Sequence, residues 1–253
     1  MKNLLRFTKG NSKLSKTTLI FDTSAGHSCP FAIDCLSKAD RVTGKIKDGK
    51  DTKFRCYAAS AEALYPTVRL LRWHNFDLLK QTKGTKQLTD LISDSITNSK
   101  YFSKKITHVR IHTSGDFFKK DYFQAWLNVA KLFPNLTFYC YTKAIHFWVE
   151  EKNNVPNNFI LTASKGGKFD LLIDSHNLKK CEVVYSVEEA ISKDLPIDHE
   201  DTYPLVPNQS FAILIHGTQP AKTEASKAMM KLRKEGLNGY GKASKRIKKL
   251  KAA

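Results

Sequence analysis

Three cysteine residues in the first quarter of the chain have the side-chain type and spacing that could bind a metal. Five residues separate Cys29 from Cys35, and Cys56 follows after a further twenty. Thiolate sulfur is a soft ligand that selects zinc or iron–sulfur centres, and a helix N-terminus stabilises thiolate charge. The pattern predicts a soft metal centre. The alternative is that the three are packing residues, because cysteine is among the most buried residue types.

A fourth ligand would decide which metal is bound. His27 lies two residues before Cys29 and could complete a tetrahedral Cys3His zinc site. His112 or His216 could instead reach the metal from other segments. Without any of these, three cysteines would leave one iron of a [4Fe–4S] cluster open to a substrate or cofactor. The C-x5-C-x20-C spacing is standard for neither centre, so zinc and iron–sulfur both stay open.

Cysteine usage and the lack of long apolar runs predict a cytoplasmic protein. The chain has five cysteines, an odd number that favours free thiols in a reducing compartment over disulfides. Cys140 and Cys181 lie inside predicted strands, where packing is the better interpretation. No segment has the length and apolar character of a signal peptide or a membrane span. We therefore expect no membrane partner.

The positive charge of the chain is concentrated at its C-terminal end. The formal net charge is +18, and residues 221–253 hold 11 Lys and Arg against 2 Glu, a contribution of 11 − 2 = +9. Such a segment attracts polyanions, most often nucleic acid, through phosphate contacts and counterion release. A solvated helical tail without a partner is the equally supported alternative, because charge alone carries no specificity.

Strand-like and helix-like segments alternate about six times along the chain. The predicted strands are 17–23, 107–115, 135–143, 158–167, 181–186 and 210–218, and the predicted helices are 58–80, 86–98, 120–133, 146–152, 187–193 and 222–236. This alternation predicts an α/β fold with a parallel sheet, which we expect to be an incomplete (β/α) barrel rather than an open doubly wound sheet. We expect an α/β metal-binding domain over 1–220, an irregular insertion loop over 36–54, and a basic helical tail over 221–253.

Polar and small residues follow most of the predicted strands, where both candidate folds place their chemistry. Ser114, Gly115 and Asp116 follow the second strand, Lys143 follows the third, and His216 follows the last. We expect Asp116, Lys143 and His216 to line a shared pocket, as an acid, a cation and a titratable group. Capping of the next helix is the alternative for Asp116.

Two further loops and one helix are interpreted as structural and not as binding sites. The loops 10–13 and 164–167 could offer backbone N–H groups to an anion. Neither matches a phosphate-binding fingerprint, so we interpret both as ordinary loops. Residues 122, 123, 126, 129 and 130 recur at helical spacing and are predicted to form the core face of a helix.

Taken together, these segments resemble the uncharacterised phage gene product 88 family. The resemblance rests on GNSKL (10–14), SAGHSCP with Cys35 (24–35), CYA (56–58), RIHTSGDFF with the later AW (110–126), FYCYTKA with HFW (138–148), and HGTQP (216–220). It covers residues 10 to about 220 and implies a phage context, with no activity attached. The basic tail lies outside the matched pieces.

The chain is also loosely similar to radical S-adenosylmethionine enzymes. Those have a partial six-unit (β/α) barrel, three cysteines after the first strand, and a glycine-acid motif after the second. Here Ser114-Gly115-Asp116 stands where that cofactor-binding motif is expected. The distant Cys56 departs from the compact C-x3-C-x2-C of that group. The likeness implies an open-iron [4Fe–4S] cluster more than it implies the radical reaction.

We therefore expect a phage-type iron–sulfur protein in which Cys29, Cys35 and Cys56 bind a [4Fe–4S] cluster, for redox or radical chemistry in an open pocket. The alternative is a zinc-stabilised nucleic-acid-binding protein without catalysis, in which His27 is the fourth ligand. The sequence identifies no substrate. Whether the protein is an enzyme stays open at this point.

Overall fold

A computed structural model describes residues 3–11 and 13–237 of the chain. Its elements, in chain order, are β1 (Phe7–Lys9), β2 (Thr18–Phe21), β3 (Ser37–Ala39), β4 (Ile46–Asp48), α1 (Tyr57–Leu64), α2 (Pro66–Gln81), α3 (Thr85–Thr97), β5 (His108–Ile111), α4 (Lys120–Leu132), β6 (Thr137–Thr142), α5 (Ile145–Glu151), η1 (Lys152–Asn154), β7 (Phe159–Ser164), α6 (Leu171–Ser175), β8 (Lys180–Val184), α7 (Val187–Ser192), η2 (Tyr203–Leu205), β9 (Phe211–Leu214) and α8 (Glu224–Lys234).

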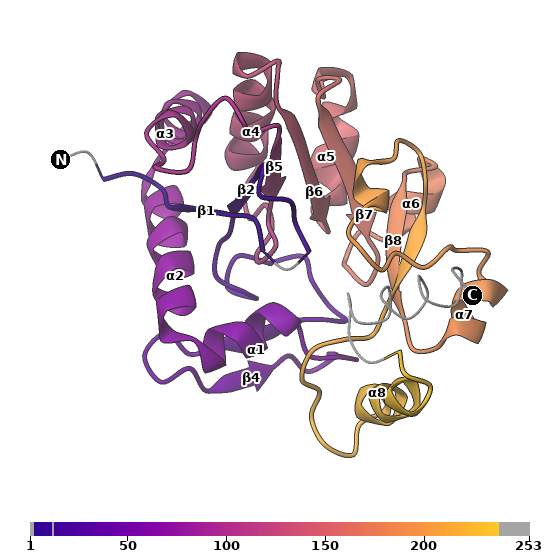
Figure 1. The fold of residues 1–253 in the computed structure, drawn as a ribbon. Helices are drawn as coiled ribbons and strands as arrows, with labels where there is room; N and C mark the ends of the chain where they lie inside the picture. The colour runs from indigo at the N-terminus through magenta and orange to yellow at the C-terminus, as the bar shows by residue number, and fades with distance from the viewer. Residues whose placement is uncertain (1–2, 12, 238–253) are drawn as a thin grey trace.

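A mostly parallel sheet forms the centre of the molecule (Figure 1). Its seven strands run in the order β1-β2-β5-β6-β7-β8-β9. Strand β1 pairs antiparallel with β2, and every other neighbouring pair is parallel. Each strand after β2 is therefore added at the same edge, which places the connecting helices on one face when the crossovers are right-handed. This arrangement confirms the predicted α/β class.

The two faces of this sheet have different surroundings. Residues such as Leu19, Val109 and Phe138 are fully buried in one apolar core with residues of α3 and α4. Their neighbours along the strands, such as Ile20 and Arg110, point to the opposite face, because successive side chains of a strand alternate. In Figure 1, α4 and α5 lie along the outer side of the strands, and α1 lies on the opposite side.

The helix predicted over 58–80 is in fact two helices. Helix α1 ends at Leu64 and α2 begins at Pro66, and Tyr65 between them has an extended backbone. Proline disfavours helical geometry in the residue before it and fits the first position of a helix. The prediction of one continuous helix was wrong because this signal was overlooked.

The insertion over 36–54 is more regular than the sequence indicated. It contains the antiparallel pair β3–β4, with Ser37 opposite Asp48 and Ala39 opposite Ile46. The turn between the two strands is held by Asp40, whose Oδ1 accepts hydrogen bonds from three donors in residues 42–43. Such side-chain bonds to the nearby backbone stabilise turns that weak periodicity does not reveal.

The C-terminal helix α8 spans Glu224–Lys234, within the predicted range of 222–236, and covers part of the basic segment. Thr223 caps α8, and its Oγ1 accepts a hydrogen bond from Ser226 N at 3.2 Å. The rest of the predicted tail, residues 238–253, lies outside the described residues. None of the described helices has the length and apolar character needed to cross a membrane.

Candidate functional site

A cavity of about 820 Å³ lies against the inner face of the sheet. Strands β2, β5, β6, β7, β8 and β9 each contribute a lining residue, and α1, α2 and the turn after β1 form other walls. Volumes of this size are typical of small-molecule sites. The cavity contains the sequence-predicted Cys29, Cys35, Cys56, Ser114, Gly115, Asp116, Lys143 and His216.

The loop that carries Cys29 and Cys35 follows β2 and is held by the turn after β7. Ile33 N and Asp34 N both donate to Gly166 O, at 3.1 and 3.0 Å, and Lys168 N donates to Phe31 O at 2.9 Å. These bonds connect segments more than 130 residues apart. The loop 164–167, expected to be an ordinary loop, therefore fixes the cysteine loop in place.

The insertion closes on itself and returns Cys56 to the same wall of the cavity. Lys53 N and Phe54 N donate to Asp34 O at 2.8 and 3.1 Å. Cys56 N then donates to Ser37 Oγ at 3.2 Å, and helix α1 starts at the next residue. The twenty residues between Cys35 and Cys56 thus form a loop whose two ends are hydrogen-bonded to each other. This loop accounts for the long spacing between Cys35 and Cys56.

The three thiols are half-buried and are close enough to affect one another. Burial raises the pKa of Cys29 well above its usual value, and the charges of Asp116, Cys56 and Cys35 raise it further. Burial also raises the pKa of Cys56 to about 11, with a further contribution from Cys35. All three sulfurs are therefore held as neutral thiols at neutral pH unless a cation stabilises their thiolates.

Two buried cations lie near these thiols. The charge of Lys143 lowers the pKa of Cys35, opposing the larger effect of burial, and the charge of Arg72 does the same for Cys56. Within residues 3–11 and 13–237, no three or more His, Cys, Asp and Glu side chains form a group that could hold a metal ion.

The loop after β5 approaches the cysteine loop very closely at Gly115. Gly115 has φ +90°, and a Cβ there would lie 1.9 Å from Thr23 Oγ1 and 2.6 Å from Ser28 Oγ. Only glycine fits this backbone position. The close approach brings Ser114 and Asp116 to the cavity wall beside the loop of Cys29.

Asp116 holds two strand ends together with its carboxylate. Its Oδ1 accepts from Phe117 N at 2.7 Å and from Thr142 Oγ1 at 2.6 Å, and its Oδ2 accepts from Lys143 N at 2.7 Å. Burial raises its pKa to about 6. Helix α4 is capped at Lys119, so the alternative role of Asp116 as the helix cap is wrong.

Lys143 extends from the end of β6 to the end of β7. Its Nζ donates to Ser164 O and Ser164 Oγ, both at 3.0 Å, and to Lys165 O at 2.6 Å. Three acceptors satisfy the three donors of an ammonium group, which explains how this cation is buried. Lys143 thus adds a fixed positive charge to the cavity wall.

His216 lies at the end of β9 and faces α1. Its Nδ1 lies 3.0 Å from Leu214 O, and its ring centroid is 5.2 Å from that of Tyr57. Burial lowers the pKa of His216 to about 4, so the ring is neutral at pH 7. The Tyr57 hydroxyl donates to Thr113 O, which fixes the ring of Tyr57 across the cavity.

The other two histidines considered as ligands are engaged in different ways. His27 lies outside the cavity lining: its Nε2 is 3.1 Å from Ala39 O, and its ring packs 4.6 Å from that of Trp73. His112 borders the cavity, with its Nε2 2.8 Å from Tyr122 Oη. Burial lowers the pKa of His112 to about 3.

The sequence features and the fold can now be compared with known proteins. The sequence pattern of the family described as gene product 88 matches residues 4–233. The chain belongs to the gene product 88 family. This result confirms the resemblance inferred from the motifs.

Two bacteriophage relatives are identical to this chain at about a quarter of the aligned positions. The gene 88 protein of Mycobacterium phage D29 is 26% identical over 167 residues, which are 62% of this chain and 62% of the relative. The gene 88 protein of Mycobacterium phage L5 is 28% identical over 149 residues, or 56% and 54% of the two chains. The chain therefore spans less than two thirds of these relatives. No solved structure matches it, so the looser likeness to radical S-adenosylmethionine enzymes has no such support.

Sequence reasoning on this gene product 88 chain missed a buried charge network beside the cysteines. Arg72 of α2 lies 3.4 Å from Asp22 Oδ2 and 3.3 Å from Glu62 Oε1, and it donates to Ala58 O at 3.0 Å. The carboxylates outweigh burial and raise the pKa of Arg72, so it stays charged. A signal did exist, because Arg69, Arg72 and Asn75 share one helical face with the buried Leu79.

Cys181 is buried in a strand, as expected, but it faces a different side of the sheet from Cys140. It lines the cavity from β8, whereas Cys140 faces the helices. The alternation of residues along a strand could have separated the two only if the inner face had been known.

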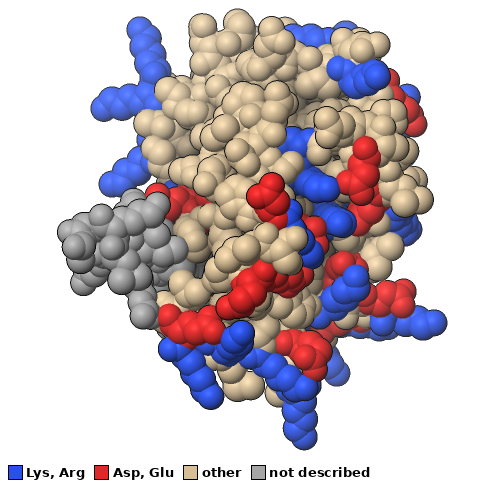
Figure 2. Space-filling model, turned by 90° about the vertical axis from the view of Figure 1, so that its right-hand side faces the viewer, with Lys and Arg blue, Asp and Glu red and all other residues tan. Residues whose placement is uncertain are grey.

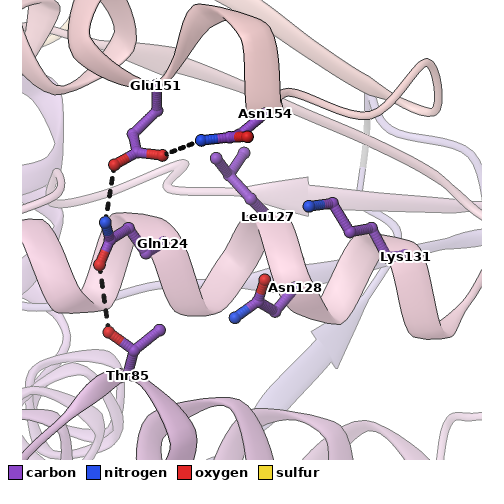
Figure 3. Close-up of a pocket in the computed structure, with 7 residues that line it drawn as sticks. All are labelled: Thr85, Gln124, Leu127, Asn128, Lys131, Glu151 and Asn154. Carbon is purple, nitrogen blue, oxygen red and sulfur yellow. Dashed lines mark hydrogen bonds between the residues drawn. The ribbon is translucent and has the colours of Figure 1, made fainter.

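A second pocket, of about 270 Å³, lies outside the sheet between α3, α4 and the segment 151–154 (Figure 3). Gln124 is at its centre: its Oε1 accepts from Thr85 Oγ1 at 3.1 Å, and its Nε2 donates to Glu151 Oε1 at 2.6 Å. Asn154 Nδ2 donates to the other oxygen of Glu151 at 2.8 Å. These polar groups satisfy one another, and we interpret the pocket as a structural connection between helices.

Charges of both signs are mixed on the face of this gene product 88 chain drawn in Figure 2. Lys193 lies near Glu182 and 2.8 Å from Glu189, and Lys180 lies 2.8 Å from Asp174. Paired charges of this kind present no single-sign surface to a polyanion. The nucleic-acid partner remains a prediction from composition alone.

Proposed function

We propose that this gene product 88 chain is an iron–sulfur protein of the phage-infected cytoplasm, with a [4Fe–4S] cluster in the large cavity. Cys29, Cys35 and Cys56 are its ligands, carried by a sheet that we interpret as an incomplete (β/α) barrel. The observation that carries the proposal is that these three cysteines, from two separate segments, line one wall of one cavity and affect one another's pKa.

The donor type of these residues suits a soft metal centre, but as the described side chains are placed they do not form a group that could hold a metal ion. The three sulfur atoms are donors of the type that binds iron–sulfur clusters. Lys143 and Arg72 supply buried positive charge that offsets the negative charge of thiolate ligands. Binding of a cluster requires the three cysteine side chains to change rotamer and turn toward a common centre.

A cluster bound by three cysteines supplies electron transfer and one iron open to a ligand. The side chains that line the cavity beside the cluster would have different roles. Ser114, Gly115 and Asp116 form the adjoining wall, and Asp116 fixes the position of Lys143 through the backbone. Lys143 holds a positive charge at that wall, and the neutral ring of His216, whose Nδ1 donates to Leu214 O, lies beside Tyr57 in the same lining. The cavity beyond them has room for a substrate.

The test is reconstitution of purified protein with iron and sulfide in the absence of air. We expect a brown protein with broad visible absorbance, and we expect Cys29→Ala, Cys35→Ala and Cys56→Ala each to lose most of it. Cys140→Ala is the matched control, because it removes the same atom on the other face of the sheet. Equal absorbance in all four variants would overturn the proposal.

The zinc alternative lacks a comparable observation. It needs a fourth ligand, and His27 contacts Ala39 and Trp73 outside the cavity lining. A His27→Ala variant distinguishes the two proposals. A cluster bound by the cysteines keeps its absorbance in this variant, whereas a Cys3His zinc site loses its metal.

A further inference from the structure

One side of the large cavity carries a buried arginine that no expected function includes. Arg110 points from the inner face of β5 into the cavity and is 5% exposed. Its Nη1 donates to Ile111 O at 2.8 Å and to His112 O at 3.4 Å, and its Nε lies 3.5 Å from Asp201 Oδ2 without forming a hydrogen bond. Burying a guanidinium without full partners is costly, so a group that completes its partners would bind favourably.

The structure already places a carboxylate beside this arginine. Asp201 Oδ2 lies 3.5 Å from Arg110 Nε, and Asp201 Oδ1 accepts a hydrogen bond from Tyr141 Oη at 3.1 Å. The Arg110 guanidinium also lies 4.4 Å from the centre of the Tyr141 ring. Asp201 has φ +57°, a left-handed conformation that costs energy for a residue other than glycine. Arg110 and Tyr141 therefore contact the two carboxylate oxygens of Asp201, which shows that this place can hold an anionic group.

A second cation reaches the same side of the cavity from the turn after β1. Lys13 lines the cavity, and Asn11 fixes its backbone by accepting a hydrogen bond from Lys13 N at 2.8 Å. Burial lowers the pKa of Lys13 to about 8, and the charges of Asp201 and Asp198 act in the opposite direction. Arg110 and Lys13 thus line the same cavity, and the charge of Asp201 acts on both.

The same cavity also has apolar walls. Its lining includes Leu14, Phe54, Tyr65, Val183 and Ile213. Tyr57 and Tyr141 add two ring faces. A ligand with both an anionic group and an apolar body would match this combination, because apolar area supplies affinity and the charged partners fix orientation.

We propose that this side of the cavity binds an organic anion, a carboxylate or phosphate monoester attached to an aromatic or apolar body. Arg110 and Lys13 hold the anionic group, and Asp201 limits its affinity because it adds a negative charge to the same place. Binding of this anion is independent of the cluster. Only the statement that the anion is a substrate rests on the proposed function.

Phenyl phosphate is the probe, titrated into the full-length protein by isothermal calorimetry. We expect saturable binding that weakens about tenfold or more in Arg110→Gln, because hydrogen bonds to charged groups contribute strongly. Lys13→Ala should weaken it several-fold, and Asp201→Asn should strengthen it. Lys86→Ala, at an exposed position on α3, is the control. Equal binding in the wild type, Lys13→Ala and Lys86→Ala overturns the proposal, even where Arg110→Gln does not fold.

Two further titrations test the parts of the proposal separately. Inorganic phosphate should bind more weakly than phenyl phosphate, and equal affinities would overturn the role of the apolar walls. The Cys29→Ala/Cys35→Ala/Cys56→Ala protein should bind phenyl phosphate as the wild type does. Loss of binding there would assign the anion to the cysteine wall and contradict the site at Arg110. If the protein binds no cluster, phenyl phosphate should still bind at Arg110.

Discussion

The two faces of the central sheet bury very different side chains. The outer face buries aromatic and aliphatic residues such as Phe21, Ile111 and Phe138 against α3 and α4, and Trp126 of α4 contacts Phe21 and Phe138. The inner face, with the helix opposite it, buries charged groups: Arg72, Arg110 and Asp116 are each no more than 5% exposed. Apolar burial stabilises a fold, whereas buried charge is seldom its best source of stability. The difference indicates that the outer face holds the structure together and the inner face serves a ligand.

The largest effect on the outer face should come from truncating Trp126. Its indole is fully buried and contacts Phe21 and Phe138 at centroid distances of 5.3 and 6.2 Å. Trp126→Ala should lower the free energy of unfolding by about 3–5 kcal/mol. Urea unfolding followed by circular dichroism measures this change. A loss below about 1 kcal/mol would show that the outer face is not the main source of stability.

The second largest loss of stability is expected at Gly115, where the loop after β5 packs tightly against Thr23. Gly115→Ala introduces a Cβ 1.9 Å from Thr23 Oγ1 at a left-handed backbone position. We expect a loss of about 2–4 kcal/mol, from backbone strain and from overpacking together. The same unfolding experiment tests it, with Gly84→Ala as the comparison. Gly84 also has a positive φ, but its added Cβ meets only the flexible end of Gln87. Equal losses in both variants would show that the contact with Thr23 is unimportant.

The pH dependence of stability is a third test, and it concerns His112, which borders the cavity. Burial lowers its folded pKa to about 3, so between pH 6.5 and 5 the unfolded chain takes up a proton at this residue and the folded chain does not. His112 therefore contributes a loss of stability of about 2 kcal/mol as the pH drops over this range. His216 acts in the same direction, and Asp116, whose pKa is raised to about 6, acts in the opposite one. His112→Asn should show a smaller fall, since asparagine also tolerates the φ of +60° at this position. An unchanged pH profile in the variant would contradict the assignment to His112.

The smallest effect is expected on the solvent side of the outer helices. Lys86 and Asp90 form an exposed pair with 2.9 Å between Nζ and Oδ2. Removing it with Lys86→Ala should leave the free energy of unfolding unchanged within the error of the measurement. A measurable loss would mean that surface charges contribute to stability in this protein, and the contrast between the faces would be weaker.

The sequence predicted the elements of this fold better than the side on which each residue lies. The six parallel strands and the core face with Tyr122 and Trp126 were found because apolar periodicity reports burial. The inner-face role of Arg110 and Cys181 was not found, because a short buried strand does not show which neighbours its alternate residues meet. The loop bonds that return Cys56 to Cys35 join distant backbone atoms, and no local pattern encodes them.

The candidate site was predicted as a set of residue types, and the structure supplies their relations. Cys29, Asp116, Lys143 and His216 were expected near one another because the carboxyl ends of parallel strands meet at one edge. That Asp116 bonds to the backbone of Lys143 could not be predicted, since this geometry depends on the exact ends of β5 and β6. Arg72 was missed because a charged residue on a helix is normally assigned to solvent.

The most direct test of the central claim is the iron and acid-labile sulfide content of the protein purified without exposure to air. The claim that the inner-face cysteines bind a [4Fe–4S] cluster predicts about four iron and four sulfide per chain in the wild type and in Cys140→Ala. It predicts little of either in Cys29→Ala. A wild-type protein that contains zinc alone, or no metal and no sulfide, would contradict it.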